Sequence, residues 1–326
     1  MKLVTALMVF CFFQFSSSQV YKKSEPFAHT FSIVARDTVT GNIGVAVQSH
    51  WFSVGTTVTY AEAGVGVVAT QSLVNPSYGP KGLALMKQGL SPQQALDALI
   101  ANDPGEMYRQ VAFLNTKGEV ATHTGSACIE EAGHVQGKNF SAQANMMLKN
   151  TVWDAMAKAF ETTKGDFNDR IIAALEAAQG EKGDIRGSQS AAILIVKPVA
   201  TGNSWEDVVM DLRVEDNPHP VQELKRLVKL QKAYDFMNDG DLAMEAGDSK
   251  KAEALYLSAQ KLFPENLEMR YWYAVNLLNN KQYDMAHPIL KSIFEQEPNW
   301  KTLTKRIVKN KLLVIPKEEL EKVMNL

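Results

Sequence analysis

The sequence predicts an α+β domain with two packed sheets, followed by an all-α domain built from repeats. Up to about residue 216, short apolar segments of strand length alternate with helical stretches and glycines, whereas nearly every later segment has helical periodicity. The boundary falls at Asn217-Pro218-His219-Pro220, because prolines at this spacing disfavour both helix and central strand. A chain of 326 residues also suggests about two domains. We therefore expect domains at residues 30–216 and 217–326.

The first 18 residues have the pattern of a secretion signal. Lys2 supplies a positive charge, Leu3 to Phe15 form an apolar run, and Ser16-Ser17-Ser18 offers small residues for signal peptidase. The run is too short to cross a bilayer comfortably, and an uncleaved N-terminal anchor is the alternative. We therefore expect an exported protein, periplasmic or extracellular, in which residues 19–29 form a short leader.

The first half of the α+β domain contains four strands and two helices. The apolar patterning and turn residues predict strands at 30–36, 43–48, 57–61 and 64–71, a turn at 75–80, and helices at 82–87 and 91–101. Ser91 is a good N-cap for the second helix, and Pro92 suits its first helical position. The apolar run at 64–71 is typical of a strand that is buried on both faces.

The second half repeats this order of strands and helices. A hairpin is predicted at 110–124, a strand at 140–146, helices at 151–161 and 166–179, and strands at 190–198 and 208–214. Strands followed by two helices, twice over, favour two packed sheets with helices on both outer faces.

The C-terminal domain carries an internal repeat of 34 residues. Ala252 and Ala286 are separated by this period, and so are Pro264 and Pro298. Small residues at the helix crossing and a proline at the end are the tetratricopeptide signature, so residues 233–266 and 267–300 are read as two helix pairs. Segments 221–230 and 302–326 are expected to supply capping helices. Such repeats indicate a protein or peptide partner bound through residues 233–300, the alternative being a packing domain without a partner.

Composition and charge exclude several classes of function. The formal net charge is −2, and no basic patch indicates nucleic acid or, after signal removal, a membrane surface. Cys128 is the only cysteine beyond the signal, so no internal disulfide is expected, and this thiol is read as a small buried hydrophobe or, alternatively, a nucleophile. His123 and His134 lack partners at metal-ligand spacing, and no phosphate loop or nucleophile elbow is present. We expect neither a metal nor a cofactor.

Thr30 is the first candidate for a catalytic residue because its hydroxyl stands at the head of a strand. If cleavage made it terminal, its α-amine, with a pKa of about 7.7–8.0, would be a base beside its own hydroxyl. In the encoded chain Thr30 is not terminal, so the His29–Thr30 bond would have to be cut. The alternative is a β-branched residue that simply begins a strand.

Further candidates lie where other strands end. Ser49 and His50 end the second strand, opposite Thr30 in a regular hairpin, with a register uncertain by one residue. His50 is a possible acid or base, or a histidine without a role. Thr70, Gln71, Asn75 and Asn145 are read as an oxyanion site or as turn caps. Asp184 and Arg186 are read as a loop-holding pair, or Arg186 as the ligand of a substrate carboxylate.

Several segments, in the same order, resemble the family labelled domain of unknown function 1028, which is grouped with the N-terminal-nucleophile (Ntn) hydrolases. The resemblance covers about residues 30–196 and rests on Thr30 to Asp37, Gly41 to Val47, Ala63 to Gln71, Asn75 to Gly79, Thr124-Gly125 with Cys128, Ala132 to His134, Gln143 to Met146, and Gly183 to Ala191. It implies a four-layer α-β-β-α sandwich of Ntn-hydrolase type and places Thr30 at the position of the nucleophile.

Two functions follow from these observations. The first is an exported Ntn-type amidohydrolase, which would act on an amide or peptide-like bond through a freed Thr30. The alternative is a non-catalytic secreted binding or scaffold protein, which would use an Ntn-like fold and the repeats to bind a protein or peptide. The N-terminus of the mature protein distinguishes the two.

Overall fold

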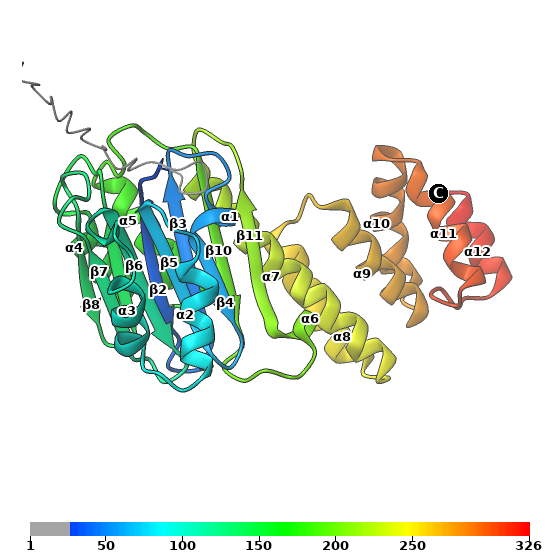
Figure 1. Cartoon of the computed structure of the whole chain (residues 1–326). Helices are drawn as coiled ribbons and strands as arrows, with labels where there is room; N and C mark the ends of the chain where they lie inside the picture. The colour runs from blue at the N-terminus through cyan, green and yellow to red at the C-terminus, as the bar shows by residue number, and fades with distance from the viewer. Residues whose placement is uncertain (1–26) are drawn as a thin grey trace, which may run out of the picture. The chain divides into compact units, whose positions relative to one another are not determined.

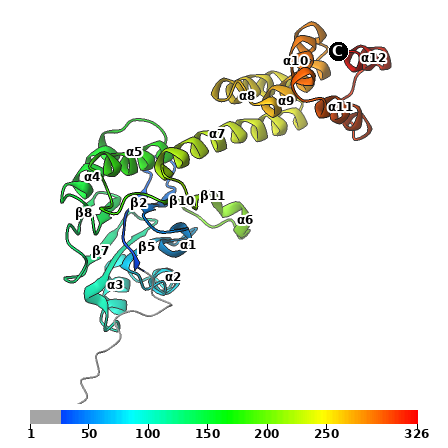
Figure 2. The same ribbon diagram turned by 90° about the horizontal axis from the view of Figure 1, so that it is seen from above.

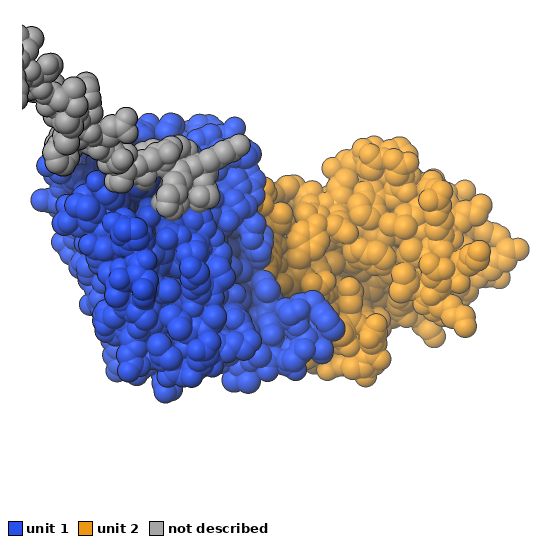
Figure 3. All heavy atoms as spheres, viewed as in Figure 1, with its two compact units in different colours: residues 1–221 blue, residues 222–326 orange. Residues whose placement is uncertain are grey.

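The computed structural model describes residues 27–326, so the predicted signal peptide and most of the leader lie outside the described residues. The chain forms two compact units, one ending at Val221 and the other beginning at Gln222 (Figures 1 and 3). Antiparallel sheets with helices make up the first unit, and helices alone make up the second, which confirms the predicted α+β class followed by an all-α region. Within residues 27–326, no helix combines the length and apolarity needed to span a bilayer.

One sheet of the first unit has six strands and is antiparallel throughout. Its strand order is β11 (Val208–Val214), β10 (Ser190–Val196), β3 (Ile43–Ser49), β2 (Thr30–Arg36), β9 (Phe140–Ala144) and β8 (Gly133–Gly137). The two central strands form the predicted hairpin, with Thr30 opposite Ser49. Its register is set at the turn, where the Asp37 amide donates to the Asn42 carbonyl at 2.8 Å.

The other sheet contains the strand that precedes Thr30. It consists of β1 (Phe27–Ala28), β5 (Gly66–Leu73), β6 (Arg109–Asn115) and β7 (Val120–Thr124), with β4 (Thr59–Glu62) also paired to β5. Strand β4 pairs with the first half of β5, and β1 pairs with Ser72 and Leu73 at its far end. Strand β1, which belongs to the leader, therefore lies along the same edge of β5 as β4.

Helices pack on the outer side of each sheet. Helices α2 (Tyr78–Lys87) and α3 (Pro92–Ile100) contact the sheet of β5, whereas α4 (Val152–Thr162) and α5 (Phe167–Gly180) contact the sheet of β2. Figure 2 shows the two helix pairs on opposite sides of the strands. Short helices α1 (Gly55–Val58), η1 (Glu106–Tyr108) and α6 (Ser204–Asp207) complete the unit. Between the sheets lies an apolar core that includes Val34, Val45, Val67 and Leu114.

Two local expectations were wrong, and one strand was missed. The predicted strand at 57–61 begins only at Thr59, because the preceding residues form α1. Helix α2 begins at Tyr78, inside the predicted turn. Strand β8 was not predicted, because its five residues include two glycines and none of them is fully buried.

The second unit consists of paired helices. They are α7 (Pro220–Glu245), α8 (Ser249–Leu262), α9 (Leu267–Asn279), α10 (Tyr283–Gln296), α11 (Asn299–Lys309) and α12 (Lys317–Met324). The small residues of the repeat, among them Ala252, Ala259 and Ala286, are fully buried. Segment 221–230 was expected to be a separate capping helix, but it is the first part of the continuous α7. No proline interrupts that segment, and the helix continues through Gly240, where a Cβ would lie only 2.7 Å from the Tyr256 ring.

Candidate functional site

Thr30 is completely buried at the start of β2. Its nitrogen is part of the peptide bond to His29, and its hydroxyl lies 3.4 Å from the Ala28 carbonyl oxygen. Strand β1, immediately before it, is paired with β5. The uncut chain therefore offers neither a free amine nor an accessible hydroxyl at Thr30.

The carbonyl oxygen of His29, on the other side of the same peptide bond, accepts two side-chain hydrogen bonds. Ser49 Oγ donates at 2.6 Å and Arg186 Nη2 donates at 2.8 Å. Ser49 reaches this oxygen because it pairs with Thr30 across the hairpin. A hydroxyl and a cation on one carbonyl oxygen withdraw electron density from its carbon.

Arg186 is held in place by Asp184. The guanidinium donates to both carboxylate oxygens, with Nε to Oδ1 at 3.0 Å and Nη2 to Oδ2 at 2.7 Å. The Asp184 side chain is completely buried, whereas that of Arg186 is about one-quarter exposed, at 28%. The structure therefore forms the loop-holding pair, and the same arginine also reaches the His29 carbonyl.

The imidazole of His29 is oriented by Asn145. The Asn145 amide nitrogen donates to Gln110 Oε1 at 2.9 Å and faces the Thr30 carbonyl oxygen at 3.4 Å, so its oxygen faces His29 Nδ1 at 2.8 Å. This arrangement assigns the proton to Nδ1. Burial lowers the pKa of His29, against the opposing effect of the Asn145 hydrogen bond, so the ring is neutral at pH 7.

Three glutamines and a serine extend this arrangement into a network of buried polar side chains. Gln71 Nε2 donates to Gln110 Oε1 at 2.7 Å and to the Thr30 carbonyl at 3.3 Å. Ser32 Oγ donates to Gln71 Oε1 at 2.6 Å and accepts from Gln143 Nε2 at 2.6 Å. All of these side chains are fully buried. We define Ser32, Gln71, Gln110, Gln143 and Asn145 as the amide network; it fixes the backbone of Thr30 through directed hydrogen bonds.

The sequence analysis placed Ser49 and His50 opposite Thr30 and interpreted Gln71 and Asn145 as oxyanion donors or turn caps, but it gave no role to Gln110 or Gln143. Gln110 Nε2 donates to Thr124 Oγ1 at 2.9 Å and to the Ala144 carbonyl at 2.9 Å, which makes it the centre of the network. Both glutamines sit at inward positions of buried strands, where a large polar side chain needs partners. A glutamine within a predicted strand was the only sequence feature that could have indicated these two residues.

The other predicted residues lie outside this cluster. The side chain of His50 is exposed, and its backbone amide donates to Asp184 at 3.3 Å. Thr70 alternates with Gln71 and so faces away from the amide network; its hydroxyl donates to the Asn75 carbonyl at 3.2 Å. Thr70 therefore caps the adjacent turn, which was the alternative reading.

Asn75 belongs to a second polar group around Asp103. Asn75 Nδ2 lies 3.4 Å from an Asp103 oxygen, and Tyr78 and Arg109 donate to the same carboxylate. Burial by itself would raise the pKa of Asp103, but the Arg109 hydrogen bond and the Gly105 amide lower it below its ordinary value. This group joins β6 to the start of α2 and holds the buried Arg109 in place.

Cys128, His123 and His134, which were not expected to bind a metal, also have local partners. Cys128 is partly buried with Sγ 3.4 Å from the Arg109 carbonyl, and burial raises the pKa of its thiol. His134 Nδ1 lies 2.8 Å from Thr124 Oγ1, and His123 Nε2 lies 3.1 Å from a Glu106 carboxylate oxygen. Over residues 27–326, no three His, Cys, Asp or Glu residues come together as a metal site.

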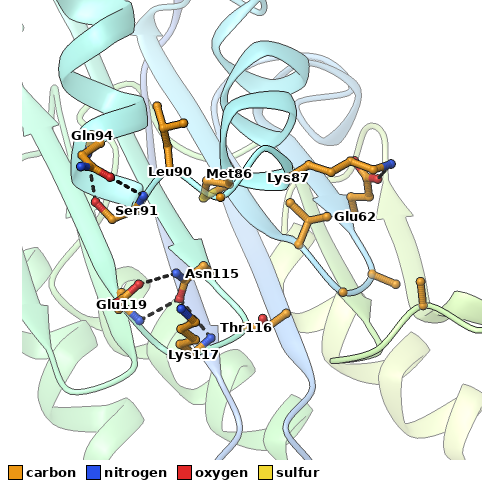
Figure 4. Close-up of a pocket in the computed structure, with 15 residues that line it drawn as sticks. Glu62, Met86, Lys87, Leu90, Ser91, Gln94, Asn115, Thr116, Lys117 and Glu119 are labelled. Atoms are coloured by element: carbon orange, nitrogen blue, oxygen red, sulfur yellow. Dashed lines mark hydrogen bonds and ion pairs between the residues drawn. The ribbon is translucent and has the colours of Figure 1, made fainter.

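A pocket of about 550 Å³ lies at the opposite end of β5 from Gln71 (Figure 4). Met86 and Leu90 line its apolar part, and the Lys87–Glu62 ion pair at 2.6 Å lies at its edge. Asn115 fixes the facing turn, because its side-chain oxygen accepts from the backbone amides of residues 117 and 119. No predicted site residue lines this pocket.

Comparison with known proteins identifies the family. Residues 30–224 match the family of unknown function DUF1028, and residues 243–307 match a tetratricopeptide repeat. A crystal structure of the DUF1028 protein SPO2555 from Silicibacter pomeroyi is similar, with 31% sequence identity and a TM-score of 0.56. The match covers 62% of this chain and 88% of that one. The search of curated proteins finds no match. The chain therefore belongs to the DUF1028 family. Its second unit carries a tetratricopeptide repeat region.

Proposed function

We propose that the chain is the precursor of an exported Ntn-type amidohydrolase that is activated by cutting the His29–Thr30 bond. The observation that carries this proposal is the pair of hydrogen bonds on the His29 carbonyl oxygen, from Ser49 and Arg186. These donors stand where negative charge develops when this bond is attacked, and one such donor contributes roughly 2.7–4 kcal/mol to a barrier. The two sheets with outer helices would then be the four-layer sandwich of the Ntn type.

The cleavage itself would use Thr30. Its hydroxyl oxygen attacks the carbonyl carbon of His29, and Ser49 and Arg186 stabilise the resulting oxyanion. Breaking the C–N bond passes the hydroxyl proton to the freed amine and leaves an ester between His29 and Thr30. Water hydrolyses that ester, which gives a carboxylate on His29 and a free amine and hydroxyl on Thr30.

The freed site would then hydrolyse an external amide by the same chemistry. The Thr30 amine takes the proton from its own hydroxyl, and the hydroxyl oxygen attacks the carbonyl carbon of the substrate, which takes the place of His29. The substrate C–N bond then breaks, the leaving amine takes that proton, and water hydrolyses the resulting ester to a carboxylate and the free Thr30 hydroxyl. Ser49 and Arg186 would hold the substrate oxygen, while Gln71 and Asn145 hold the backbone of Thr30. The exposed His50, and Thr70 on the opposite face of its strand, have no part in this mechanism.

The test is the intact mass of the purified full-length protein after export. We expect the wild type and Thr30→Ser to begin at residue 30, and Thr30→Ala to keep the residues before it. Thr38→Ala, at an exposed threonine in the hairpin turn, is the matched control and should be cut normally. Cut protein should hydrolyse members of an amide library that Thr30→Ala leaves intact.

A wild-type protein that keeps residues 20–29 would contradict the proposal and favour the second candidate, a secreted binding or scaffold protein. The specific observation in its favour is the complete burial of Thr30 behind a paired β1. In that case the repeat region would supply the function, because tetratricopeptide repeats mediate protein–protein interaction.

A further inference from the structure

A run of positive charge without acidic residues lies near the C-terminal end of the second unit. Residues 299–316 contain five lysines and arginines and no acidic residue, although the whole chain has a formal net charge of −2. Among the described residues, Lys305, Arg306, Lys309 and Lys311 form no ion pair. The overall composition, with a net charge near zero, does not reveal this local cluster.

Three of these cations lie on one face of α11. Thr304 and Ile307 are buried on its inner face, whereas Lys305, Arg306 and Lys309 are exposed. Spacings of one and four residues place the three on the same side of a helix, away from the buried pair.

Two aliphatic side chains are exposed directly after this helix. Leu312 and Val314 are 52% and 68% exposed, while Leu313 between them is 1% exposed. Asn279 on α9 binds both neighbours of Leu313: its side-chain nitrogen donates to the Leu312 carbonyl at 2.9 Å, and its oxygen accepts from the Val314 amide at 2.8 Å. These two hydrogen bonds therefore fix the backbone so that Leu313 points inward, while the side chains of Leu312 and Val314 remain exposed to solvent.

Lys311 occupies a position that usually belongs to glycine. Its φ is +59°, in the left-handed region, at the end of α11. Glycine takes this conformation at helix ends without steric strain. A lysine here thus adds charge beside Leu312 at some expense in stability.

We propose that these residues form a docking surface for an anionic phospholipid membrane. We define the basic–apolar patch as Lys305, Arg306, Lys309, Lys311, Leu312 and Val314. Lysines are compact charges without directional preference, which suits a diffuse layer of headgroup charge. Aliphatic side chains that follow them directly in the chain can enter the boundary between headgroups and acyl chains. Base stacking would require aromatic side chains, which the patch does not contain.

The carboxylates nearest in the chain form no ion pair with the patch. Glu318, the nearest on the C-terminal side, is exposed and is not paired with any of the four cations. Glu319 is buried and paired with His287 at 2.6 Å and Lys322 at 3.1 Å, and Glu321 lies 4.0 Å from Lys317. Glu297, at the other end of α11, accepts from the Asn299 amide at 3.2 Å. The four cations are thus left to interact with an external anionic surface.

The experiment is co-sedimentation of the full-length protein with large vesicles. Vesicles of phosphatidylcholine with 30 mol% phosphatidylglycerol, about the anionic content that gives a strong surface potential, are compared with pure phosphatidylcholine. We expect binding to the anionic vesicles only, and weaker binding as salt is raised. Replacing all four cations by glutamine should lower the partition coefficient by about fivefold per charge. L312S/V314S should weaken binding at every salt concentration.

The matched control K250Q/K261Q/K291Q removes three exposed lysines elsewhere in the same unit and should retain most of the binding. Lys311→Gly separates binding from folding, because it should keep or raise Tm while weakening binding about fivefold. The proposal is overturned if wild type fails to bind anionic vesicles at low salt, or if the four-cation variant binds equally well. The proposal is also overturned if the protein binds an acidic peptide but does not bind anionic vesicles.

Discussion

The two ends of the space between the sheets differ in chemistry, although the same strands supply both. At one end Val34, Val45 and Leu114 pack as apolar core, and at the other the amide network surrounds the backbone of Thr30. Apolar packing tolerates local adjustment, whereas a network of directed hydrogen bonds specifies one arrangement and is costly when incomplete. The contrast indicates that the polar end is built for position and the apolar end for stability.

The largest expected effect comes from Gln110→Leu, at the polar end. Loss of Gln110 Oε1 leaves the amide nitrogens of Gln71 and Asn145 without this acceptor. Each buried group left unsatisfied costs about 1–3 kcal/mol, so we expect roughly 2–6 kcal/mol of lost unfolding free energy. Urea denaturation measures it, and intact mass should show impaired cutting at His29–Thr30.

The triple substitution Gln71→Leu, Gln110→Leu, Asn145→Leu sharpens this prediction. It removes both donors together with their shared acceptor, but it also takes away the partners of Ser32 Oγ, His29 Nδ1 and the Thr30 carbonyl oxygen. It should therefore be at least as destabilising as Gln110→Leu alone, and a triple variant that is more stable than the single one would contradict this account of the network.

A somewhat smaller effect is expected from Leu114→Ala, at the apolar end. Leu114 is completely buried between the sheets, and its truncation should cost about 2–5 kcal/mol through lost burial and a cavity. Cutting at His29–Thr30 should continue in the fraction that folds, as measured by intact mass at low temperature. Loss of cutting in folded Leu114→Ala would contradict the division between the two ends.

The smallest effect is a pH dependence from His29. Its folded pKa is lowered below the ordinary 6.5, so between these two values the unfolded chain binds more protons. Stability should therefore be full above about pH 6.5 and decrease as pH falls below it. Urea denaturation of the uncut Thr30→Ala protein, which keeps His29, measures this slope at a series of pH values. His29→Gln in the same background should reduce the slope.

The hairpin and the repeats could be predicted because local patterns specify them. The position of Ser49 opposite Thr30 follows from a regular hairpin, and the turn at 37–42 decides that Ser49, and not His50, faces inward. The repeat of 34 residues can be recognised from the spacing of equivalent residues alone. Both depend on residues that are near one another in sequence.

The amide network could not be assembled from local patterns. Gln71, Gln110 and Gln143 come from three strands distant in sequence, and β5 is buried on both faces. Its alternation therefore does not reveal whether Thr70 or Gln71 faces the other sheet. Only the pairing of the two sheets decides this, and the pairing is a property of the whole domain.

The pairing of β1 with β5 has a consequence for how a substrate would approach. If cutting after His29 released this short strand, the backbone groups of Ser72 and Leu73 would lose their partners. An open strand edge binds an extended peptide by β-augmentation, with main-chain hydrogen bonds supplying affinity independently of side chains. The departing leader would thus act as a template, and the preferred ligand would be a short extended chain whose carbonyl takes the place of that of His29.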